Sequence, residues 1–389
     1  MVSYQKGKNR DIKNEKTGTS KMRTLYLFLI ISLTTMNIHA QPEKSRLFTW
    51  SQAKQLPDPE GFAGPYAGVS QESLIVAGGS NFPGGKRPWD NAVKGWYDDI
   101  YVLKSIDGTW MKVGKLPRPM GYGVALTYKN SVICVGGGDS KHCYSDVFSI
   151  TLNDNKIKIK YLASLPEPLM NSCGVIEDNV LYVIGGITTP TGETLNNFWC
   201  LDLKKTGSSH HWKKLEDFPG QSRMLATAGA FEGSIYLFGG THLYHEGNGL
   251  QRKYLQDCWK YSGHKWKSVA ELPIPLVATP SPAYAWSSKL ILFGGDDGYY
   301  AKKIFEIKDL HPGFRNEVLS YDVAGDKWSV TDHIPVIHKT DSAFNPHNSV
   351  YAPVTTPLVI WDHKIVIAGG EARPGVRSNR VLIATPKKD

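Results

Sequence analysis

Six short apolar runs, each ending in paired glycines, constrain the fold more than any other feature of this chain. They read SLIVAGGS, SVICVGGG, VLYVIGGI, SIYLFGGT, KLILFGGD and KIVIAGGE. A continuous apolar run of this length predicts a β-strand buried on both faces. The glycines indicate places where neighbouring backbones leave no room for side chains. The chain is therefore predicted to repeat one β-structural unit six times.

Each glycine pair is followed by a second strand-like run, such as DDIYVLK, and in five cases by an aromatic strand that closes on Leu-Pro or a similar pair. The sixth closing strand, FTWSQAKQLP at residues 48–57, stands at the other end of the chain. We expect it to pair with the strand near Val381–Thr385 and to close a ring of blades. The predicted fold is all-β: a six-bladed kelch-type β-propeller closed by an N-terminal strand. Its blades of about 58 residues exceed the kelch period of roughly 50. A propeller of seven WD40 blades is disfavoured, because Gly-His and Trp-Asp pairs do not recur.

Residues 1–40 have the layout of a secretory signal peptide. A basic start precedes an apolar core at residues 25–33, and the small residue Ala40 precedes the expected cleavage point. The core is too short for a comfortable membrane span. Met22 is an alternative start, because the preceding residues are unusually polar. These features predict export to the periplasm without a membrane anchor, with the propeller in residues 41–389.

Charge and cysteine content exclude several classes of partner. The net charge of +9 is concentrated in residues 1–40, which hold seven Lys/Arg and two Asp/Glu. The remainder offers a weak case for nucleic acid, and none is expected. Because five is an odd number, at least one cysteine stays unpaired. Cys134 and Cys200 lie in strand-like runs, so we expect both to be buried free thiols. Their spacing fits no zinc pattern, and no metal is expected.

The most charged loop, LYHEGNGLQRKY at residues 243–254, directly follows one of the apolar runs. In a propeller, loops at this position converge over the central channel, so polar residues there are candidates for substrate binding. A structural hydrogen-bonding role is the alternative for each of them. The remaining candidates, beyond this loop, are Asn81, Arg223, His242, Asp296 with its neighbour Asp297, Glu371 and Arg377.

The segments GGSNFPGG, WYDDIYVL, the HEG loop and GGEARPGVRS, together with the diglycine repeats, resemble the N-acetylneuraminate epimerase family of sialic acid mutarotases, including its cyclically permuted members. The resemblance covers residues 46–386. It implies an exported six-bladed propeller that interconverts the α and β anomers of sialic acid without a cofactor. Its oligomeric state is left open, a homodimer included.

The resemblance also implies a catalytic pair, which falls on Glu246 of YHEG and Arg252 of LQRKY. Ring opening needs a base for the anomeric hydroxyl and an acid for the ring oxygen. Arg suits the substrate carboxylate because its planar fork binds two oxygens. Lys253 is an alternative cation and His245 a rival base or a substrate ligand. The general acid is not identified.

Two other functions fit a kelch propeller. One is a non-catalytic module that binds a glycan or a protein partner. The other is a copper radical oxidase, which is disfavoured because the cysteines lie mostly within strands. Fold alone does not separate an enzyme from a binding module. The discriminating feature is whether Glu246, Arg252 and either Arg223 or Arg377 converge on one pocket.

Overall fold

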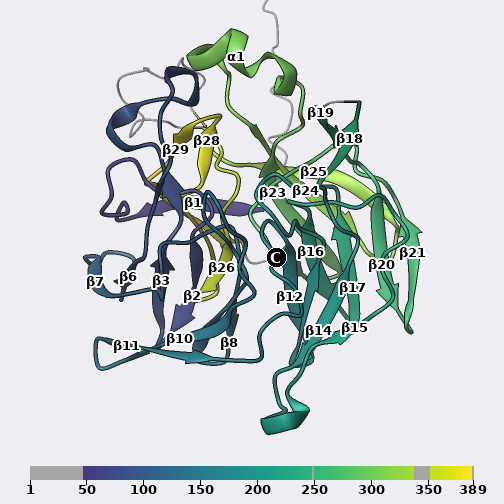
Figure 1. Ribbon diagram of the computed structural model, residues 1–389, viewed down its shortest axis with the longest axis horizontal. Helices are drawn as coiled ribbons and strands as arrows, with labels where there is room; N and C mark the ends of the chain where they lie inside the picture. Colours follow the sequence, from purple (N-terminus) through teal and green to yellow (C-terminus); the bar gives the residue numbers. More distant parts are fainter. Residues whose placement is uncertain (1–46, 248, 337–350, 388–389) are drawn as a thin grey trace, which may run out of the picture. The chain divides into compact units, whose positions relative to one another are not determined.

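Six four-stranded antiparallel sheets are arranged as the blades of a β-propeller in the computed structural model, which describes residues 47–247, 249–336 and 351–387 (Figure 1). The predicted fold is confirmed. The expected signal peptide lies outside the described residues. Within the described part of the chain, no helix has the length and apolarity needed to cross a membrane.

The strands of each blade are given in order from the channel outward. The first three blades are β2 (Tyr66–Ser70), β3 (Ser73–Ala77), β6 (Asp99–Leu103) and β7 (Met111–Lys115); β8 (Val124–Tyr128), β9 (Ser131–Val135), β10 (Val147–Asn153) and β11 (Lys156–Tyr161); and β12 (Cys173–Glu177), β13 (Val180–Ile184), β14 (Phe198–Asp202) and β15 (Lys213–Lys214). The last three are β16 (Thr227–Phe231), β17 (Ser234–Phe238), β20 (Cys258–Ser262) and β21 (Lys265–Val269); β22 (Tyr284–Trp286), β23 (Lys289–Gly295), β24 (Arg315–Asp322) and β25 (Lys327–His333); and β26 (Leu358–Trp361), β27 (Lys364–Ala368), β30 (Val381–Pro386) and β1 (Phe48–Ala53).

The ring is closed by strands from both ends of the described chain, as predicted. β1 pairs antiparallel with β30, from Phe48 opposite Pro386 to Ala53 opposite Val381. The side chain of Phe48 is buried and lies 5.4 Å from the ring of Phe293 in the preceding blade, centroid to centroid. The N-terminal strand therefore completes the sixth blade and also packs against the fifth.

The diglycine strands are the second strand of each blade, and another strand lies between each of them and the channel. Sequence analysis did not single out these innermost strands, which include TAGAF in β16 and CGVIE in β12. They are short, and in most of them small or polar residues interrupt the apolar run. Innermost strands of adjacent blades contact one another around the channel, as β12 does with β16.

Tryptophans near the start of four outer strands tie each of those blades to the preceding one. Each indole nitrogen donates to a backbone carbonyl in the preceding blade, just before the Leu-Pro or Phe-Pro pair that ends that preceding blade. The pairs are Trp110 to Lys54, Trp212 to Ala163, Trp266 to Glu216 and Trp328 to Ala270, at 2.8, 2.8, 3.0 and 2.9 Å. The leucine or phenylalanine of each pair is itself buried. The recurring Trp and Leu-Pro signals thus mark contacts between blades.

The loops between the second and third strands carry extra elements on one face of the propeller. Three are two-stranded hairpins: β4 (Ser80–Asn81) with β5 (Gly95–Trp96), β18 (Thr241–Glu246) with β19 (Gly249–Tyr254), and β28 (Glu371–Arg373) with β29 (Val376–Arg377). The fifth blade instead carries η4 (Ala301–Lys303), α1 (Ile304–Ile307) and η5 (Lys308–Leu310). η1 (Pro83–Gly85) and η2 (Pro88–Asp90) lie in the corresponding loop of the first blade, whereas η3 (Gly207–Ser209) lies between the third and fourth strands of the third blade. Figure 1 shows β18, β19, β28, β29 and α1 above the blades.

All five cysteines are free thiols. Cys134 is fully buried in β9, as predicted, and burial raises the pKa of its thiol well above the ordinary value. Cys200 in β14 is only partly buried. The sequence therefore located both residues in strands but overestimated the burial of Cys200.

Candidate functional site at the mouth of the central channel

Six residues, one from each blade junction, form a closed ring of backbone hydrogen bonds at one end of the channel. Each N–H donates to the carbonyl of the residue before it in the ring, at 2.7 or 2.8 Å. The members are Gly64, Tyr122, Asn171, Leu225, Ala278 and Thr355, and all six have positive φ. Because every backbone N–H of the ring is used, these residues can donate a hydrogen bond to a ligand only through their side chains. We call this end of the channel the mouth.

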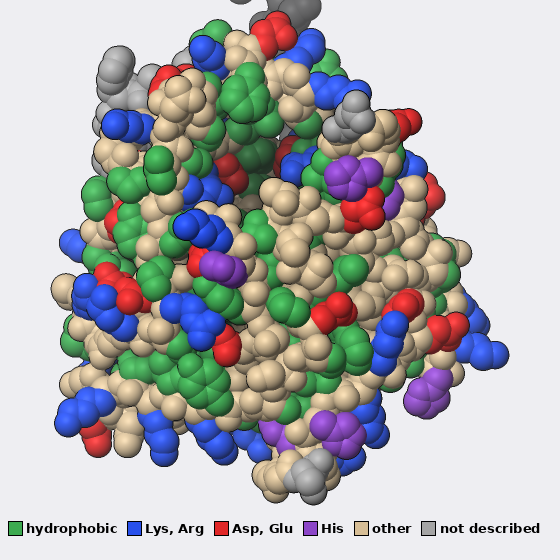
Figure 2. Space-filling view, viewed as in Figure 1, with side chains coloured by type: hydrophobic (Ala, Val, Ile, Leu, Met, Phe, Trp, Pro, Cys, Tyr) green, Lys and Arg blue, Asp and Glu red, His purple; other side chains and the backbone are tan. Residues whose placement is uncertain are grey.

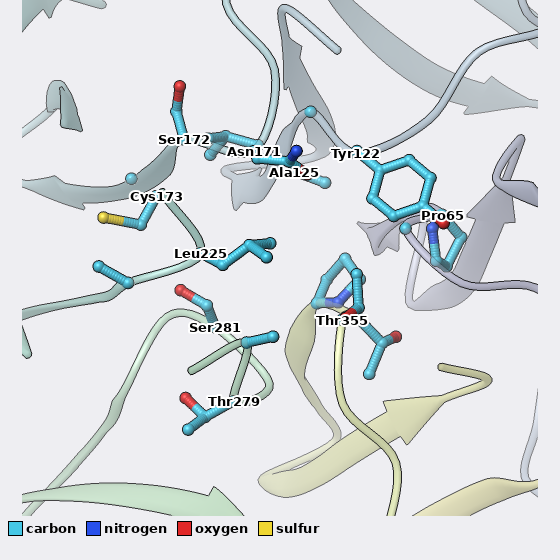
Figure 3. A pocket seen from close by; sticks show the side chains of 18 of the residues that line it. Pro65, Tyr122, Ala125, Asn171, Ser172, Cys173, Leu225, Thr279, Ser281 and Thr355 are labelled. Carbon is cyan, nitrogen blue, oxygen red and sulfur yellow. The ribbon is translucent and has the colours of Figure 1, made fainter. Parts of the chain in front are cut away.

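A pocket with a cavity volume of about 70 Å³ lies at the mouth and extends down the channel. Its walls come from the starts of the innermost strands, and Figure 3 shows side chains from different blades around one common space. Hydroxyl and amide groups of Asn171, Ser172, Thr279 and Thr355 lie among apolar side chains. A wall of this composition suits a polyhydroxylated ligand with apolar faces.

The residue after each glycine pair bridges to the residue that precedes a ring member. These positions are occupied by Ser80, Gly138, Ile187, Thr241, Asp296 and Glu371. Only Asp296 and Glu371 are charged, and they belong to adjacent blades. Burial raises the pKa of Asp296, and the Glu371 carboxylate adds to the increase. Acidic charge is therefore confined to one side of the mouth at this level.

Arg377 of β29 connects Glu371 with Tyr122. Its Nη1 donates to Glu371 Oε1 at 3.0 Å and its Nη2 to the Tyr122 hydroxyl at 3.4 Å. The guanidinium is buried, and its Cζ lies 4.8 Å from the centroid of the Phe82 ring. Glu371 also accepts from the Gly375 N–H at 2.8 Å. The ion pair is therefore fixed in orientation by a neighbouring loop and an aromatic ring.

Lys94 lies on the other side of Tyr122. Its Nζ is 3.4 Å from the Tyr122 hydroxyl and 5.5 Å from the centroid of the Trp96 ring. Burial alone would raise the pKa of Tyr122, but Lys94, Arg377 and the hydrogen bond with Ser80 outweigh burial and Glu371, so the pKa is lowered. Two cations thus favour the phenolate form of a tyrosine that lines the pocket.

Tyr254, at the base of the β18–β19 hairpin, donates its hydroxyl to Asp296 Oδ2 at 3.0 Å. Asp296 also accepts from the Gly298 N–H at 2.9 Å. Burial raises the pKa of Asp296 despite these bonds, and burial together with Asp296 raises the pKa of Tyr254 to about 12. Arg252 interacts with the same phenol. Arg252 is therefore linked to the mouth through Tyr254 and Asp296.

Glu246 and His245 lie at the exposed end of the hairpin. The register places Glu246 opposite Gly249 and Arg252 opposite Leu243. Because side chains alternate along a strand, Glu246 and Arg252 are on opposite faces of the hairpin. His245 shares the face of Arg252, and its N–H donates to Glu193 Oε1 at 2.9 Å. The structure thus brings Arg252 toward the mouth and does not place Glu246 beside it.

Three other candidates use their polar groups within the protein. Asn81 donates to Asp58 Oδ1 and the Gly61 carbonyl and accepts from the Tyr97 hydroxyl. Arg223 is fully buried and pairs with Asp257 Oδ2 at 2.5 Å.

His242 Nδ1 is 2.8 Å from the Ser222 carbonyl and 3.1 Å from Thr194 Oγ1, and its ring stacks on Tyr244. These networks hold loops together. The candidates that converge on the mouth are instead Asp296, Glu371 and Arg377.

Sequence analysis missed Tyr122, Lys94 and Tyr254. A signal for the ring positions exists: in five blades they follow the proline of the Leu-Pro or Phe-Pro pair by five to seven residues. Lys94 and Tyr254 carry no such spacing, because they reach the mouth from hairpins of different length. Within residues 47–247, 249–336 and 351–387, no group of three or more His, Cys, Asp or Glu side chains is placed to hold a metal.

Figure 2 shows a hollow below the α1 segment, with acidic and basic side chains on its walls.

Residues 30–159 match a family model described as N-acetylneuraminate epimerase. Curated relatives with that name from Salmonella typhi and Salmonella typhimurium strain LT2 are each 38% identical over 127 residues, which is 29% of this chain and 33% or 32% of theirs. One from Yersinia pestis is 38% identical over 86 residues, 20% of this chain and 21% of its own. The match spans about a third of the length of the Salmonella relatives, and over that part the resemblance is confirmed.

The family match includes some parts of the candidate site and not others. It covers the closing strand β1, the first blade and the second blade up to residue 159 in β11, with Lys94 and Tyr122. The β18–β19 hairpin with Glu246 and Arg252 lies beyond it, as does Arg377. The roles of these three residues therefore depend on geometry and on local motifs.

Proposed function

We propose that this protein is an exported mutarotase that interconverts the α and β anomers of N-acetylneuraminate. The observation that carries the proposal is the pairing of fixed cations with a hydroxyl-lined pocket at the mouth. Arg377 and Lys94 flank Tyr122, and Tyr122 lines that pocket. A sugar acid needs both features, because its carboxylate requires a cation and its hydroxyls require hydrogen-bonding partners.

Mutarotation of a 2-keto sugar acid requires only proton transfers and rotation. A base takes the proton of the anomeric hydroxyl while an acid protonates the ring oxygen, and the bond between C2 and the ring oxygen breaks. Rotation about the bond that joins C2 to the ring chain presents the other face of the ketone. Closure then returns both protons. The reaction consumes nothing, so it needs no cofactor.

Glu246 is our proposed base and Arg252 our proposed ligand for the substrate carboxylate, on the strength of the YHEG and LQRKY motifs. The link from Arg252 through Tyr254 to Asp296 supports a role for Arg252 near the mouth. Asp296 is the rival base, because it already lies at the mouth with a raised pKa. Arg377 is a second proposed carboxylate ligand.

The test is anomer exchange of N-acetylneuraminate, followed by proton NMR with and without protein. We expect exchange well above the rate in buffer. A rate equal to that in buffer would exclude the mutarotase function and leave binding to be measured by calorimetry with the same sugar.

A non-catalytic glycan-binding propeller is the second candidate. It is favoured by one observation: Glu246 and Arg252 lie on opposite faces of their hairpin, and Arg223 is bound within the protein. A binding module would keep the pocket at the mouth and show saturable affinity for sialic acid without exchange. The NMR and calorimetric measurements together separate the two functions.

A further inference from the structure

We propose that Tyr122 is the general acid that protonates the ring oxygen of the bound sugar acid, an inference that rests on the mutarotase function proposed above. The base alone cannot open the ring, because the departing ring oxygen must receive a proton. Tyr122 lines the pocket, and its phenol is a proton donor held at the mouth beside Ser80. In Figure 3 its ring borders the space shared by the channel residues.

The backbone holds Tyr122 in one position. Its N–H donates to the Gly64 carbonyl and its own carbonyl accepts from Asn171, both at 2.8 Å within the closed ring. Its side chain packs on Gly64, where a Cβ would approach Tyr122 Cγ to 2.7 Å. Gly64 also has φ of +63°, so a larger residue there would both clash with Tyr122 and strain the backbone. The phenol is thereby held in one orientation at the mouth.

Three groups surround the phenol oxygen and stabilise its negative charge after the proton leaves. Ser80 Oγ is 2.9 Å away, and Lys94 Nζ and Arg377 Nη2 are each 3.4 Å away. The opposing charge is Glu371, which is neutralised in part by its ion pair with Arg377. The same cations lower the pKa of Tyr122, which makes it a stronger acid than an ordinary tyrosine.

The proton balance closes over one cycle. The base takes the proton of the anomeric hydroxyl, and the electron pair of that O–H bond forms the C2 carbonyl. The bond from C2 to the ring oxygen breaks, and the ring oxygen takes the Tyr122 proton. After rotation, the hydroxyl attacks the other face of C2 and returns its proton to the phenolate, while the base returns its own to the new anomeric oxygen.

The test compares Tyr122→Phe with Tyr128→Phe in the full-length mature protein. Tyr128 lies at the other end of the same stretch, in β8, where its hydroxyl bonds Asn179 at 3.0 Å and Lys129 Nζ lies 5.1 Å from its ring centroid. It therefore controls for the loss of a phenol next to a lysine. We expect Tyr122→Phe to lower kcat for anomer exchange by about 10²-fold with a small change in KM, and Tyr128→Phe to leave both unchanged.

The pH profile separates proton donation from a structural role. After the buffer rate is subtracted, wild-type activity should fall as pH rises through the pKa of Tyr122, because the phenol loses its proton. Lys94→Met should move that fall to higher pH, since one cation is lost, and this variant tests the proposal even if Tyr122→Phe does not fold. Near-ultraviolet titration, wild type minus Tyr122→Phe, should show a tyrosinate that forms below the ordinary range.

Each outcome decides one point. Wild-type exchange with an equally active, folded Tyr122→Phe would overturn the acid role and leave the mutarotase function standing. A pH profile unchanged by Lys94→Met would also overturn it. A wild type no faster than buffer would overturn both proposals. If Tyr122→Phe loses rate while Tyr128→Phe does not, and Lys94→Met shifts the pH profile of exchange, Tyr122 is supported as the acid.

Discussion

At the scale of single residues, the mouth joins cations, carboxylates and phenols that arrive from different blades. Arg377 is bonded to Glu371, and Tyr254 is bonded to Asp296. The pKa of Asp296 is raised, whereas that of Tyr122 is lowered. Titratable groups whose pKa values are pushed in opposite directions within one site are typical of acid–base catalysis. Single substitutions can therefore assign their roles.

Glu246→Gln keeps the size of the side chain and removes the proposed base. We expect it to slow anomer exchange by about 10²- to 10⁴-fold, the usual contribution of a general base, without loss of folding. Arg252→Ala should mainly raise KM, because a charge-assisted contact with the substrate carboxylate is lost. The measurement is anomer-resolved NMR at several substrate concentrations.

Asp296→Asn is the comparison for Glu246→Gln. If Asp296→Asn abolishes exchange while Glu246→Gln is fully active, the base lies at the mouth instead of on the hairpin. If neither variant loses activity, His245 is the next candidate.

His311 provides a test of stability against pH. Its side chain is buried, Nδ1 accepts from the Gly313 N–H at 3.1 Å, and burial and Arg373 lower its pKa from 6.5 to about 4. Below pH 6.5 the unfolded chain takes up a proton that the folded protein resists until about pH 4. Stability should therefore fall as pH decreases through this window.

The control for this prediction is His311→Asn, whose amide oxygen can still accept from Gly313. Urea unfolding between pH 7 and pH 4 should show a weaker pH dependence in the variant than in the wild type. Parallel curves for the two proteins would contradict the prediction.

Buried charge outside the mouth should affect stability and not activity. Arg223 is fully buried, and its loss would leave the Asp257 carboxylate without its ion pair. We expect Arg223→Ala to lower the free energy of unfolding by about 3 kcal/mol. Arg315→Ala is the control, because Arg315 pairs with Glu317 at the surface, where a pair contributes about 1 kcal/mol or less. If chemical denaturation showed the same loss of unfolding free energy in both variants, burial of the Arg223 ion pair would add nothing to stability.

At the scale of elements, the sequence predicted strands where the signal was a continuous apolar run or a Trp and Leu-Pro pattern. The diglycine strands, the outer strands and the closing role of β1 were found in this way. The innermost strands were missed, because they are short and small or polar residues interrupt the apolar run in most of them. Hairpin register was missed as well, so the opposite orientation of Glu246 and Arg252 emerged only from the structure.

Removal of residues 46–58 tests the closure of the ring. The deletion would expose the edge of β30 and remove the Phe48 side chain from the core between the fifth and sixth blades. It would also remove the Lys54 carbonyl that accepts from Trp110. We expect a sharp fall in Tm and aggregation through the exposed edge. Removal of residues 41–45 alone leaves β1 in place and should melt like the full protein, and a 46–58 deletion that does the same would contradict the closure.

At the scale of the whole molecule, six blade junctions contribute one residue each to the hydrogen-bonded ring, and the site is built on top of it. Repetition made the fold predictable, because each unit carries the same signals. The site depends on departures from repetition: a tyrosine at one ring position, and carboxylates at two of the six positions after the glycines. Such departures are visible in sequence only after the repeat has been aligned in space.

The proposed export would add a constraint on the mature chain. We expect cleavage after Ala40, because a basic start, an apolar core and a small residue precede it. The mature protein would then begin at Gln41, ahead of Phe48, where β1 starts, so the closing strand would be retained. Cleavage beyond Phe48 would remove part of that strand and leave the ring open. Intact-mass measurement and N-terminal sequencing of periplasmic protein check this, and a secreted chain that still begins at Met1 or Met22 would contradict it.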